Sequence, residues 1–420
     1  MPNTKVLCSI ITIGDELLIG QTIDTNSAWM AQALNAVGIW VHRRVAVGDD
    51  YDAITTTLTH EATLSNIVLI TGGLGPTSDD ITKPLLCNYF KASMVVHEPT
   101  EQHIKAIFAK LNRPLLAVNL KQAEVPNNCT VLHNATGTAP GMWWEQHQVV
   151  YVSMPGVPAE MQGIMSTSVI PMLLQKYTPA NIVHRTILTA GMGESFIAER
   201  LVAFEAALPS HIKLAYLPNY SFVRLRLTAT ADDQLFLINE INQYHEQLQA
   251  LVNDIMVTNQ DETIEQVVAN LLLRHHKTVA TAESCTGGYI AHCLTAMAGS
   301  SAYYNGSVVA YAYQAKEDLL QVDHTELTSK GAVSQEVVTQ MAKGALLQLH
   351  TDYAIATSGI MGPAGGTPDK PVGTVCIAVA HANKVVSHKF QFRWNRKKNI
   401  ELAALNALDM LRKLIIETEN

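Results

Sequence analysis

Apolar residues run almost without interruption from position 5 to 14 and again from 67 to 71. Runs of this length without alternation predict strands that are buried on both faces. Helical spacing of apolar residues appears over 25–37 and 50–64, and 39–47 has the pattern of another strand. Strands that alternate with helices of this length predict βαβ units, and therefore a parallel sheet with helices on both faces.

The pattern changes twice further along the chain. From about 171 to 256, short strands and helices alternate and carry little reactive chemistry, which predicts a small α+β module. From 257 onward βα elements recur, two apolar strands follow, and a helix near 399–416 closes the chain. We therefore predict an α/β protein of three domains: a doubly wound sheet over 1–170, the α+β module over 171–256, and a second α/β domain over 257–420.

Composition narrows the class of protein. The chain has 420 residues, of which 48% are apolar and 16% charged, so it can form packed cores and is not typical of disorder. A net charge of −8 argues against a dedicated nucleic-acid binder. The first residues lack a signal-peptide pattern, no apolar stretch is long enough to span a membrane, and the six cysteines are scattered. These features predict a cytoplasmic protein with reduced thiols and no membrane or nucleic-acid partner.

Three glycine-rich segments carry the candidate chemistry of the first domain. Each follows a predicted strand, and parallel sheets bind ligands at the carboxyl ends of their strands. Glycines let a turn point its N–H groups inward and so hold an anion, which predicts a phosphate or nucleotide pocket. The candidate ligand contacts are Gly14, Asp24, Asn26, Gly72, Gly73, Gly75, Thr77, Gly137, Gly141 and Gly156.

Four carboxylates lie beside these glycines: Asp15, Glu16, Asp79 and Asp80. A divalent ion (Mg, Mn or Co) held by carboxylates can neutralise a pyrophosphate and activate water. We predict that this group binds such an ion. The alternative for Asp79 or Asp80 is a helix cap, and the spacing leaves open which of the four bind the metal.

The first two domains resemble part of a known family. The motifs GDELLxG, TGGLGPTxDDxT, NxxGTAPG and PGVPxE occur in this order and resemble the N-terminal domain of the CinA family. That domain is similar to the molybdopterin-binding fold, and the resemblance implies metal-dependent hydrolysis of ADP-ribose to AMP and ribose 5-phosphate. The middle module resembles the family's KH-like segment. Its Gly-Met-Gly-Glu at 191–194 is not the GxxG loop that clamps RNA, so we predict a packing or dimerisation role.

The last domain offers a hydroxyl nucleophile. Ser284 lies where a predicted strand meets a helix, and Lys316 and Tyr311 follow on later segments. A serine can open an amide when a neutral lysine takes its proton, and turn N–H groups can stabilise the oxyanion. The alternative for Ser284 is a helix cap or a phosphate contact. Cys285 is a rival nucleophile, but no histidine partner is evident, so we favour the serine.

The motifs AESCTGG, GSS, YxxxxK, GAVS, SGIxGPxGG and KPVGTV resemble the C-terminal CinA domain over about 263–414. The resemblance implies a nicotinamide-nucleotide amidase, which converts nicotinamide mononucleotide to nicotinate mononucleotide and ammonia without a cofactor. It assigns the nucleophile to Ser284, the base to Lys316, and supporting roles to Tyr311, Ser358 and Arg396. The implied substrate contacts are Glu283, Thr286, Gly287, Gly288, Gly359 and Gly362.

Three departures from the family pattern keep other functions open. Tyr313 replaces a usual asparagine, Met361 enters a glycine-rich loop, and Trp394-Asn395-Arg396 replaces Gly-Asp-Arg. The first two are bulkier, which predicts a narrower pocket and leaves a weakened amidase as an alternative. A non-catalytic nucleotide sensor or scaffold, in competence or DNA-damage responses, is a second alternative. Molybdenum-cofactor synthesis is a third, by fold analogy alone. A homodimer is expected from the resemblance and from the frequency of such assemblies.

Overall fold

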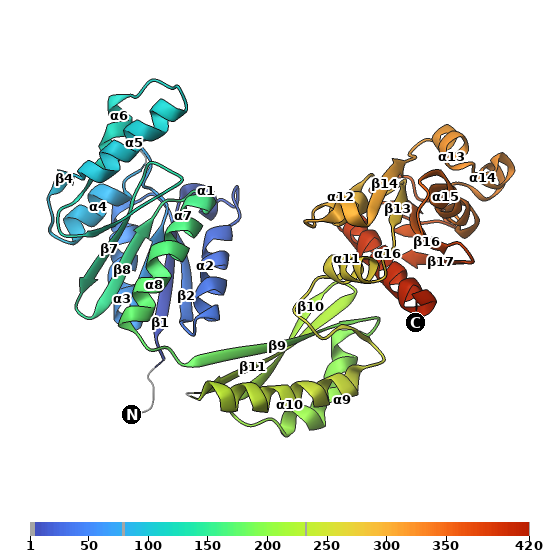
Figure 1. Ribbon diagram of the computed structural model, residues 1–420, viewed down its shortest axis with the longest axis horizontal. Coiled ribbons are helices and arrows are strands. Elements are labelled where there is room, and N and C mark those ends of the chain that lie inside the picture. The colour runs from blue at the N-terminus through green and yellow to red at the C-terminus, as the bar shows by residue number, and fades with distance from the viewer. Residues whose placement is uncertain (1–4, 78–79, 232, 420) are drawn as a thin grey trace. The chain divides into compact units, whose positions relative to one another are not determined.

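The computed structural model describes residues 5–77, 80–231 and 233–419, so Asp79 lies outside the described residues. The chain forms two compact units. One consists of Met1–Val183 with Ala229–Asn239, and the other of His184–Thr228 with Glu240–Asn420. Figure 1 traces the elements of each unit.

A six-stranded sheet of order β2-β1-β3-β8-β7-β6 forms the centre of the first unit. Its strands are β1 (Leu7–Ile13), β2 (Trp40–Val47), β3 (Ile67–Thr71), β6 (Thr130–Leu132), β7 (Gly141–Gln146) and β8 (Val149–Met154). The predicted parallel arrangement holds for β2, β1, β3 and β8. It is wrong for β6 and β7, which pair antiparallel. The reason is local: His147 and Gln148 both have positive φ, the conformation of a two-residue hairpin turn between β7 and β8.

Helices cover both faces of this sheet, as predicted (Figure 1). One face packs against α2 (Thr25–Ala36), α7 (Pro158–Ile164) and α8 (Ile170–Lys176), and the other against α3 (Tyr51–Leu64) and α4 (Thr82–Tyr89). The remaining elements are α1 (Asp15–Leu18), α5 (Glu98–Lys110), α6 (Ala117–Leu120), and the pair β4 (Met94–Val96) and β5 (Glu124–Pro126). Aspartates fix two helix starts, because Asp24 and Asp50 accept backbone N–H groups of the first turns of α2 and α3.

The middle module is the predicted α+β unit. Its four-stranded sheet has the order β10-β11-β9-β12. The elements are β9 (Asn181–Ala190), α9 (Glu194–Ala206), β10 (Ile212–Asn219), β11 (Phe222–Ala231), α10 (Gln234–Val252) and β12 (Met256–Thr258).

A five-stranded sheet of order β14-β13-β15-β16-β17 forms the C-terminal domain. Its strands are β13 (Val279–Glu283), β14 (Tyr304–Val309), β15 (Tyr353–Gly359), β16 (Thr374–His381) and β17 (Lys384–Gln391). One face packs against α11 (Ile264–Arg274), α12 (Tyr289–Thr295) and α16 (Arg396–Glu419). The other packs against α13 (Tyr313–Leu320), α14 (His324–Lys330) and α15 (Gln335–Gln348). The closing helix thus begins at Arg396, three residues before the predicted start.

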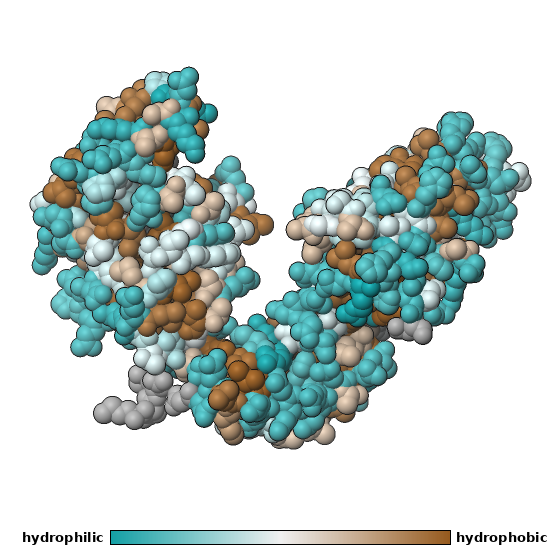
Figure 2. Space-filling view, in the orientation of Figure 1, coloured by the Kyte–Doolittle hydropathy of each residue, from teal (hydrophilic) through white to brown (hydrophobic). Residues whose placement is uncertain are grey.

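The surface in view in Figure 2 is mostly hydrophilic, with apolar side chains gathered around α5 and α6. Leu111 and Leu116 in that region are more than half exposed. Among the residues that the structure describes, no helix is both long and apolar enough to cross a membrane.

Candidate active site

The carboxyl ends of three parallel strands bring the predicted amidase residues together. β13 lies between β14 and β15 and runs parallel to both, so the three strands end at one edge of the sheet. Ser284 follows β13, Tyr311 follows β14, and Ser358 lies near the end of β15. The spacing of these residues in the sequence is large, and only strand pairing makes them neighbours.

Lys316 lies beside Ser284 in a buried position. Its Nζ is 3.1 Å from Ser284 Oγ, 2.7 Å from the carbonyl oxygen of Ala310 and 3.1 Å from that of Tyr311. The lysine is only 1% exposed, and burial lowers its pKa below the ordinary value of 10.5. A neutral amine has two N–H donors and one lone pair. The two carbonyl oxygens satisfy the donors, and the lone pair can then face the serine hydroxyl.

Glu283 holds the turn that follows Ser284. The residue is fully buried, and its carboxylate accepts the backbone N–H groups of Gly288, Ile290 and Ala291 at 2.9, 3.1 and 2.8 Å. Thr281 Oγ1 also donates to it, at 3.2 Å. With these bonds made, the carboxylate orients the start of α12. The predicted substrate contact of Glu283 is therefore replaced by a positioning role.

The turn at 285–288 retains backbone donors for an oxyanion. Gly288 is excluded, because its N–H bonds to Glu283. In the described part of the chain, no hydrogen bond takes the N–H groups of Thr286 and Gly287. Gly287 has φ +61°, a conformation that favours glycine. The N–H groups of Thr286 and Gly287 therefore remain as candidate donors to an oxyanion.

Arg396 and Tyr311 contact each other at the edge of this site. Arg396 donates from Nη2 to Tyr311 Oη at 3.2 Å and from Nη1 to the carbonyl oxygen of Gly362 at 3.0 Å. These bonds connect the end of β14, the loop after β15 and the first turn of α16. Gly359 packs against β16, since an added Cβ would lie 2.9 Å from the carbonyl oxygen of Thr374.

Ser358 lies on the same face of the sheet as Ser284 and Lys316. The preceding residue, Thr357, pairs with Glu283, and its hydroxyl contacts Thr286 Oγ1 at 2.7 Å on the other face. Side chains alternate along a strand, so Ser358 points toward the α13 side. It is 1% exposed.

Tyr313 and Met361, the two bulkier residues that depart from the family motifs, lie in different environments. Met361 is buried in the core beside α11 and α16, and therefore it does not narrow the pocket as predicted. Tyr313 is half exposed, and its Oη accepts the N–H of Ala332 at 3.4 Å. Cys285 is buried, and burial raises the pKa of its thiol to about 12, which disfavours the nucleophilic thiolate.

The glycine-rich segments of the first unit meet at one sheet edge. β1, β3 and β8 are adjacent parallel strands, and Gly14, Gly72 and Gly156 follow their ends. A cavity of about 410 Å³ opens there, lined by Gly72, Gly73, Gly75 and Gly156 among others. A smaller adjoining cavity is lined by Asp24 and Asn26.

Some predicted ligand contacts of this unit also have partners within the protein. Gly141 is buried at the start of β7, where an added Cβ would meet Ile164 and Leu132. Gly137 packs against the Glu160 carboxylate, and Thr77 donates its N–H to Asp80 at 2.9 Å. The side chain of Asp24 caps α2 through the N–H of Ser27 at 2.9 Å.

Of the three predicted metal ligands that the structure describes, two share one cavity and the third does not line it. Glu16 and Asp80 both line the 410 Å³ cavity. Asp15 does not line it, and its Oδ1 accepts the N–H of Asp49 at 3.2 Å. Asp79 lies outside the described residues. No three His, Cys, Asp or Glu side chains among the described residues form a group that could hold a metal ion. The two carboxylates of Glu16 and Asp80 fit an ion such as Mg²⁺ that takes its other ligands from substrate phosphate and water.

Three polar residues beside this cavity were missed as site residues. Glu160 lines it and accepts Asn134 Nδ2 at 2.7 Å. Buried Lys83 donates to the carbonyl oxygen of Gln122 at 3.0 Å, and burial lowers its pKa to about 8. Asn134 and Glu160 belong to the glycine-rich motifs, so the sequence contained a signal that they are site residues. For Lys83, the sequence signal is limited to its position shortly after Asp80.

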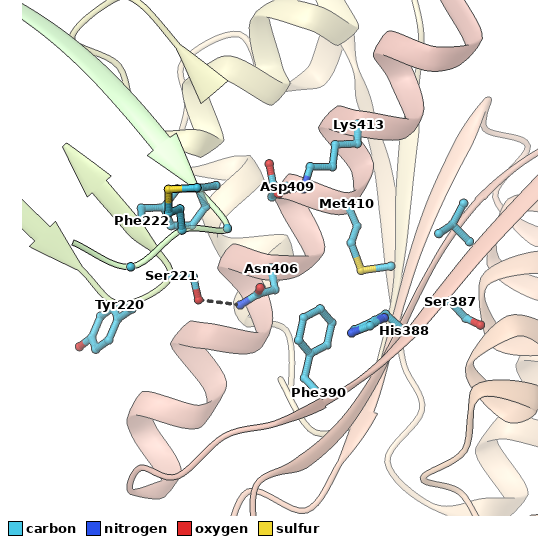
Figure 3. Close-up of a pocket in the computed structure, with 15 residues that line it drawn as sticks. Tyr220, Ser221, Phe222, Ser387, His388, Phe390, Asn406, Asp409, Met410 and Lys413 are labelled. Carbon is cyan, nitrogen blue, oxygen red and sulfur yellow. Dashed lines mark hydrogen bonds and ion pairs between the residues drawn. The ribbon is translucent and has the colours of Figure 1, made fainter. Parts of the chain in front are cut away.

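Another cavity of the second unit lies away from the predicted site residues. It measures about 580 Å³ and contains none of the predicted site residues. Figure 3 shows Phe390 and Met410 of the C-terminal domain lining it opposite Phe222 of the middle module. Asn406 Nδ2 donates to Ser221 Oγ at 3.3 Å across this junction. The cavity therefore marks where two modules pack.

Comparison with known proteins finds family profiles, similar sequences and similar structures. Family profiles match at 9–175 (probable molybdopterin binding domain), 184–256 (damage-inducible protein CinA KH domain) and 261–415 (CinA C-terminal domain). A CinA-like protein of Cytophaga hutchinsonii is 45% identical over 99% of this chain and 100% of its own length. Another, of Flavobacterium psychrophilum, is 44% identical over 97% of this chain and 98% of its own. The crystal structure of competence/damage inducible protein CihA from Agrobacterium tumefaciens is 40% identical over 36% of this chain and 94% of its own, with a TM-score of 0.35.

Proposed function

Because the chain belongs to the CinA family, we propose that its C-terminal domain hydrolyses the carboxamide of nicotinamide mononucleotide to nicotinate mononucleotide and ammonia. The observation that carries this proposal is the buried contact of 3.1 Å between Lys316 Nζ and Ser284 Oγ. A lysine whose pKa is lowered can act as a base toward a serine hydroxyl.

The reaction proceeds through an acyl-serine. Ser284 Oγ attacks the carboxamide carbon while its proton passes to Lys316 Nζ. The C–N bond of the tetrahedral adduct then breaks, and Lys316 returns the proton to the nitrogen, which leaves as ammonia. Lys316 then takes a proton from water, and the hydroxide attacks the ester carbon. The bond from this carbon to Ser284 Oγ breaks, Lys316 returns the proton to Oγ, and the acid leaves as the carboxylate after losing its proton to solvent.

Backbone and side-chain donors support the charged intermediate. The free N–H groups of Thr286 and Gly287 stabilise the oxyanion, in a turn that Glu283 holds in place. Tyr311, fixed by Arg396, and Ser358 face the substrate and orient its carboxamide over Ser284.

The test is ammonia release from nicotinamide mononucleotide by the full-length protein. We expect Ser284→Ala and Lys316→Ala each to lower kcat/KM on the order of 10³-fold or more, because the two groups act as a unit. Circular dichroism and thermal unfolding check that the variants fold. A folded Ser284→Ala variant that retains the activity of the unaltered protein contradicts the assignment.

For the N-terminal domain, we propose hydrolysis of ADP-ribose to AMP and ribose 5-phosphate. The supporting observation is that Glu16 and Asp80 line one cavity with glycine-rich turns. A divalent ion held by these carboxylates and by the substrate would neutralise the pyrophosphate. We expect Glu16→Gln to lower AMP formation about 100-fold or more and to leave ammonia release unchanged. If this variant forms AMP at the rate of the unaltered protein, Glu16 has no role in the reaction.

Turnover separates these activities from a nucleotide sensor. A sensor would show ligand-induced thermal shifts without releasing ammonia or AMP. We place the protein in the cytoplasm, which agrees with cysteines that are all free in the structure.

A further inference from the structure

The hairpin that joins β10 and β11 in the middle module contacts α16 of the C-terminal domain. Its tip consists of Tyr220 and Ser221, and Figure 3 shows both beside α16. Tyr220 Oη donates to Glu401 Oε2 at 3.3 Å, and Ser221 Oγ accepts Asn406 Nδ2 at 3.3 Å. The middle module therefore holds the N-terminal half of α16 at two points.

The ring of Tyr220 makes a third contact, with Lys398. The ammonium of Lys398 lies 4.5 Å from the centre of the Tyr220 ring and 5.4 Å from that of Trp394. An ammonium at this distance is attracted to the face of an aromatic ring. One ring belongs to the middle module and the other to the segment just before α16, so both modules contribute to the placement of this one charge.

The first turn of α16 needs partners of this kind. It contains Arg396, Lys397 and Lys398 and no acidic residue. These cations repel one another and the positive end of the helix dipole. The side chain of Asn395 caps the turn by accepting the N–H of Lys398 at 3.0 Å. The ring of Tyr220 offsets part of the remaining repulsion, because it attracts one of the three charges.

The backbone of Tyr220 has an unfavourable conformation. Its φ is +55°, in the left-handed region that favours glycine over residues with a side chain. Such conformations persist where the surrounding structure fixes them, and they are frequent at functional positions. Here the residue with this conformation is the one whose side chain contacts α16 through both its ring and its hydroxyl group.

The first turn of α16 is also part of the proposed amidase site. Arg396 donates to Tyr311 Oη at 3.2 Å and to the carbonyl oxygen of Gly362 at 3.0 Å. Lys398, the first residue of α16 that the hairpin tip contacts, lies in the same helical turn as Arg396. Because the residues of one helical turn move together, a shift at the hairpin contact displaces Arg396 and the tyrosine that it holds.

We propose that Tyr220 is a positioning residue of the amidase, which fixes Arg396 and Tyr311 through the first turn of α16. The middle module thereby completes the C-terminal site. The inference rests on the proposed function and assigns the middle module a part in it. Tyr220 acts through α16 and takes no part in the bond-breaking steps.

The experiment measures kcat and KM for ammonia release from nicotinamide mononucleotide by the full-length protein. We expect Tyr220→Ala to lower kcat/KM about fivefold or more, with most of the loss in kcat, because Tyr311 orients the reacting carboxamide. Tyr220→Phe keeps the ring beside Lys398 and loses only the bond to Glu401, so its loss should be smaller. Unchanged kcat/KM in Tyr220→Ala would overturn the proposal.

Tyr216→Ala is the matched control. Tyr216 lies on β10, and its Oη donates to Glu205 at 3.1 Å, so both partners belong to the middle module. The variant removes the same kind of side chain from the same module, and kcat/KM should stay within about twofold of the unaltered protein. Circular dichroism and thermal unfolding check that all variants fold. Equal losses in Tyr216→Ala and Tyr220→Ala would show a general effect on the module and overturn the positioning role.

A double-mutant cycle tests the route through Tyr311. Tyr311→Phe removes the hydroxyl group that Arg396 holds. In this background, adding Tyr220→Ala should cost less than about twofold in kcat/KM, because the group that Tyr220 positions is already absent. A loss as large as in the unaltered background would overturn the route through Arg396 and Tyr311.

Failure of the proposed function has a different signature. If the unaltered protein releases no ammonia, hydrogen–deuterium exchange of the backbone N–H groups of residues 398–401 still tests the contact. Faster exchange in Tyr220→Ala than in Tyr216→Ala would support the positioning of α16 and place the failure in the proposed chemistry. Equal exchange in the two variants would overturn the positioning role itself.

Discussion

At the scale of single residues, the proposed chemistry depends on the protonation state of Lys316. Water would keep this amine charged, but the residue is 1% exposed and its pKa is lowered by burial. Two backbone carbonyl oxygens and Ser284 Oγ surround Nζ, and no carboxylate is bonded to it among the described residues. The fold thus favours the neutral form that a base requires.

This arrangement predicts a pH dependence. Protonated Lys316 cannot accept the proton of Ser284. The value of kcat/KM for ammonia release should therefore fall as the pH drops through the lowered pKa of Lys316 and rise as the pH increases through it. The midpoint should lie below 10.5, the ordinary value for lysine. Rates measured from pH 5 to 10 at constant ionic strength check this. A rate that falls as pH rises through the whole range would contradict it.

Cys285 gives a second prediction at this scale. Its thiol is buried and has a pKa raised to about 12, so it is a weak source of thiolate at neutral pH. We expect Cys285→Ala to keep kcat/KM for ammonia release within about threefold of the unaltered protein, with at most about 2 kcal/mol of lost stability from the vacated core volume. If the variant folds but is inactive, the nucleophile is Cys285 Sγ and not Ser284 Oγ.

At the scale of elements, the junction of β13 and α12 sets the geometry of the site. The five residues 284–288 connect them, and Glu283 anchors the helix from the last position of the strand. One buried carboxylate therefore fixes the positions of Ser284 and of the free N–H groups of Thr286 and Gly287. The strand, the turn and the helix act as one rigid unit.

Glu283→Gln tests this unit. A glutamine side chain has one acceptor oxygen and adds an NH₂ group that would face backbone N–H donors, so at least one buried donor loses its partner. We expect the free energy of unfolding to fall by about 2–3 kcal/mol. Urea unfolding measures it, with the exposed Glu246→Gln as control, expected within about 0.5 kcal/mol. Equal stability of the two variants would show that the buried carboxylate does not hold the turn.

At the scale of the whole molecule, the two proposed activities lie on different sheets in different compact units. The proposed C-terminal site consists of Ser284, Lys316 and their backbone partners. The N-terminal cavity contains Glu16 and Asp80. Loss of one site should therefore leave the chemistry of the other intact.

Chelation separates the two sites in one preparation. EDTA should stop AMP formation from ADP-ribose and leave ammonia release from nicotinamide mononucleotide unchanged, and added Mg²⁺ should restore the first activity. Both products are measured before and after treatment. AMP formation that survives EDTA would contradict a metal-assisted reaction, and loss of ammonia release would show that the sites are coupled.

Much of the architecture follows from the sequence alone. The alternation of buried runs and helical periodicity predicted β1, β3, α2 and α3 to within a few residues, because these elements depend on local spacing. The glycine motifs of the first domain predicted which strand ends border a cavity. The family motifs likewise named Ser284 and Lys316 before their contact was known.

Only the tertiary structure decided which of these groups meet. Asp15 and Glu16 are adjacent in sequence, yet Glu16 lines the cavity and Asp15 bonds to Asp49. Met361 stands in a motif loop but packs into the core, and Lys316 reaches Ser284 across 32 positions of sequence. Local periodicity determines which face of an element a side chain occupies. It carries no information on what another element brings against that face, because strand order and helix packing determine those contacts.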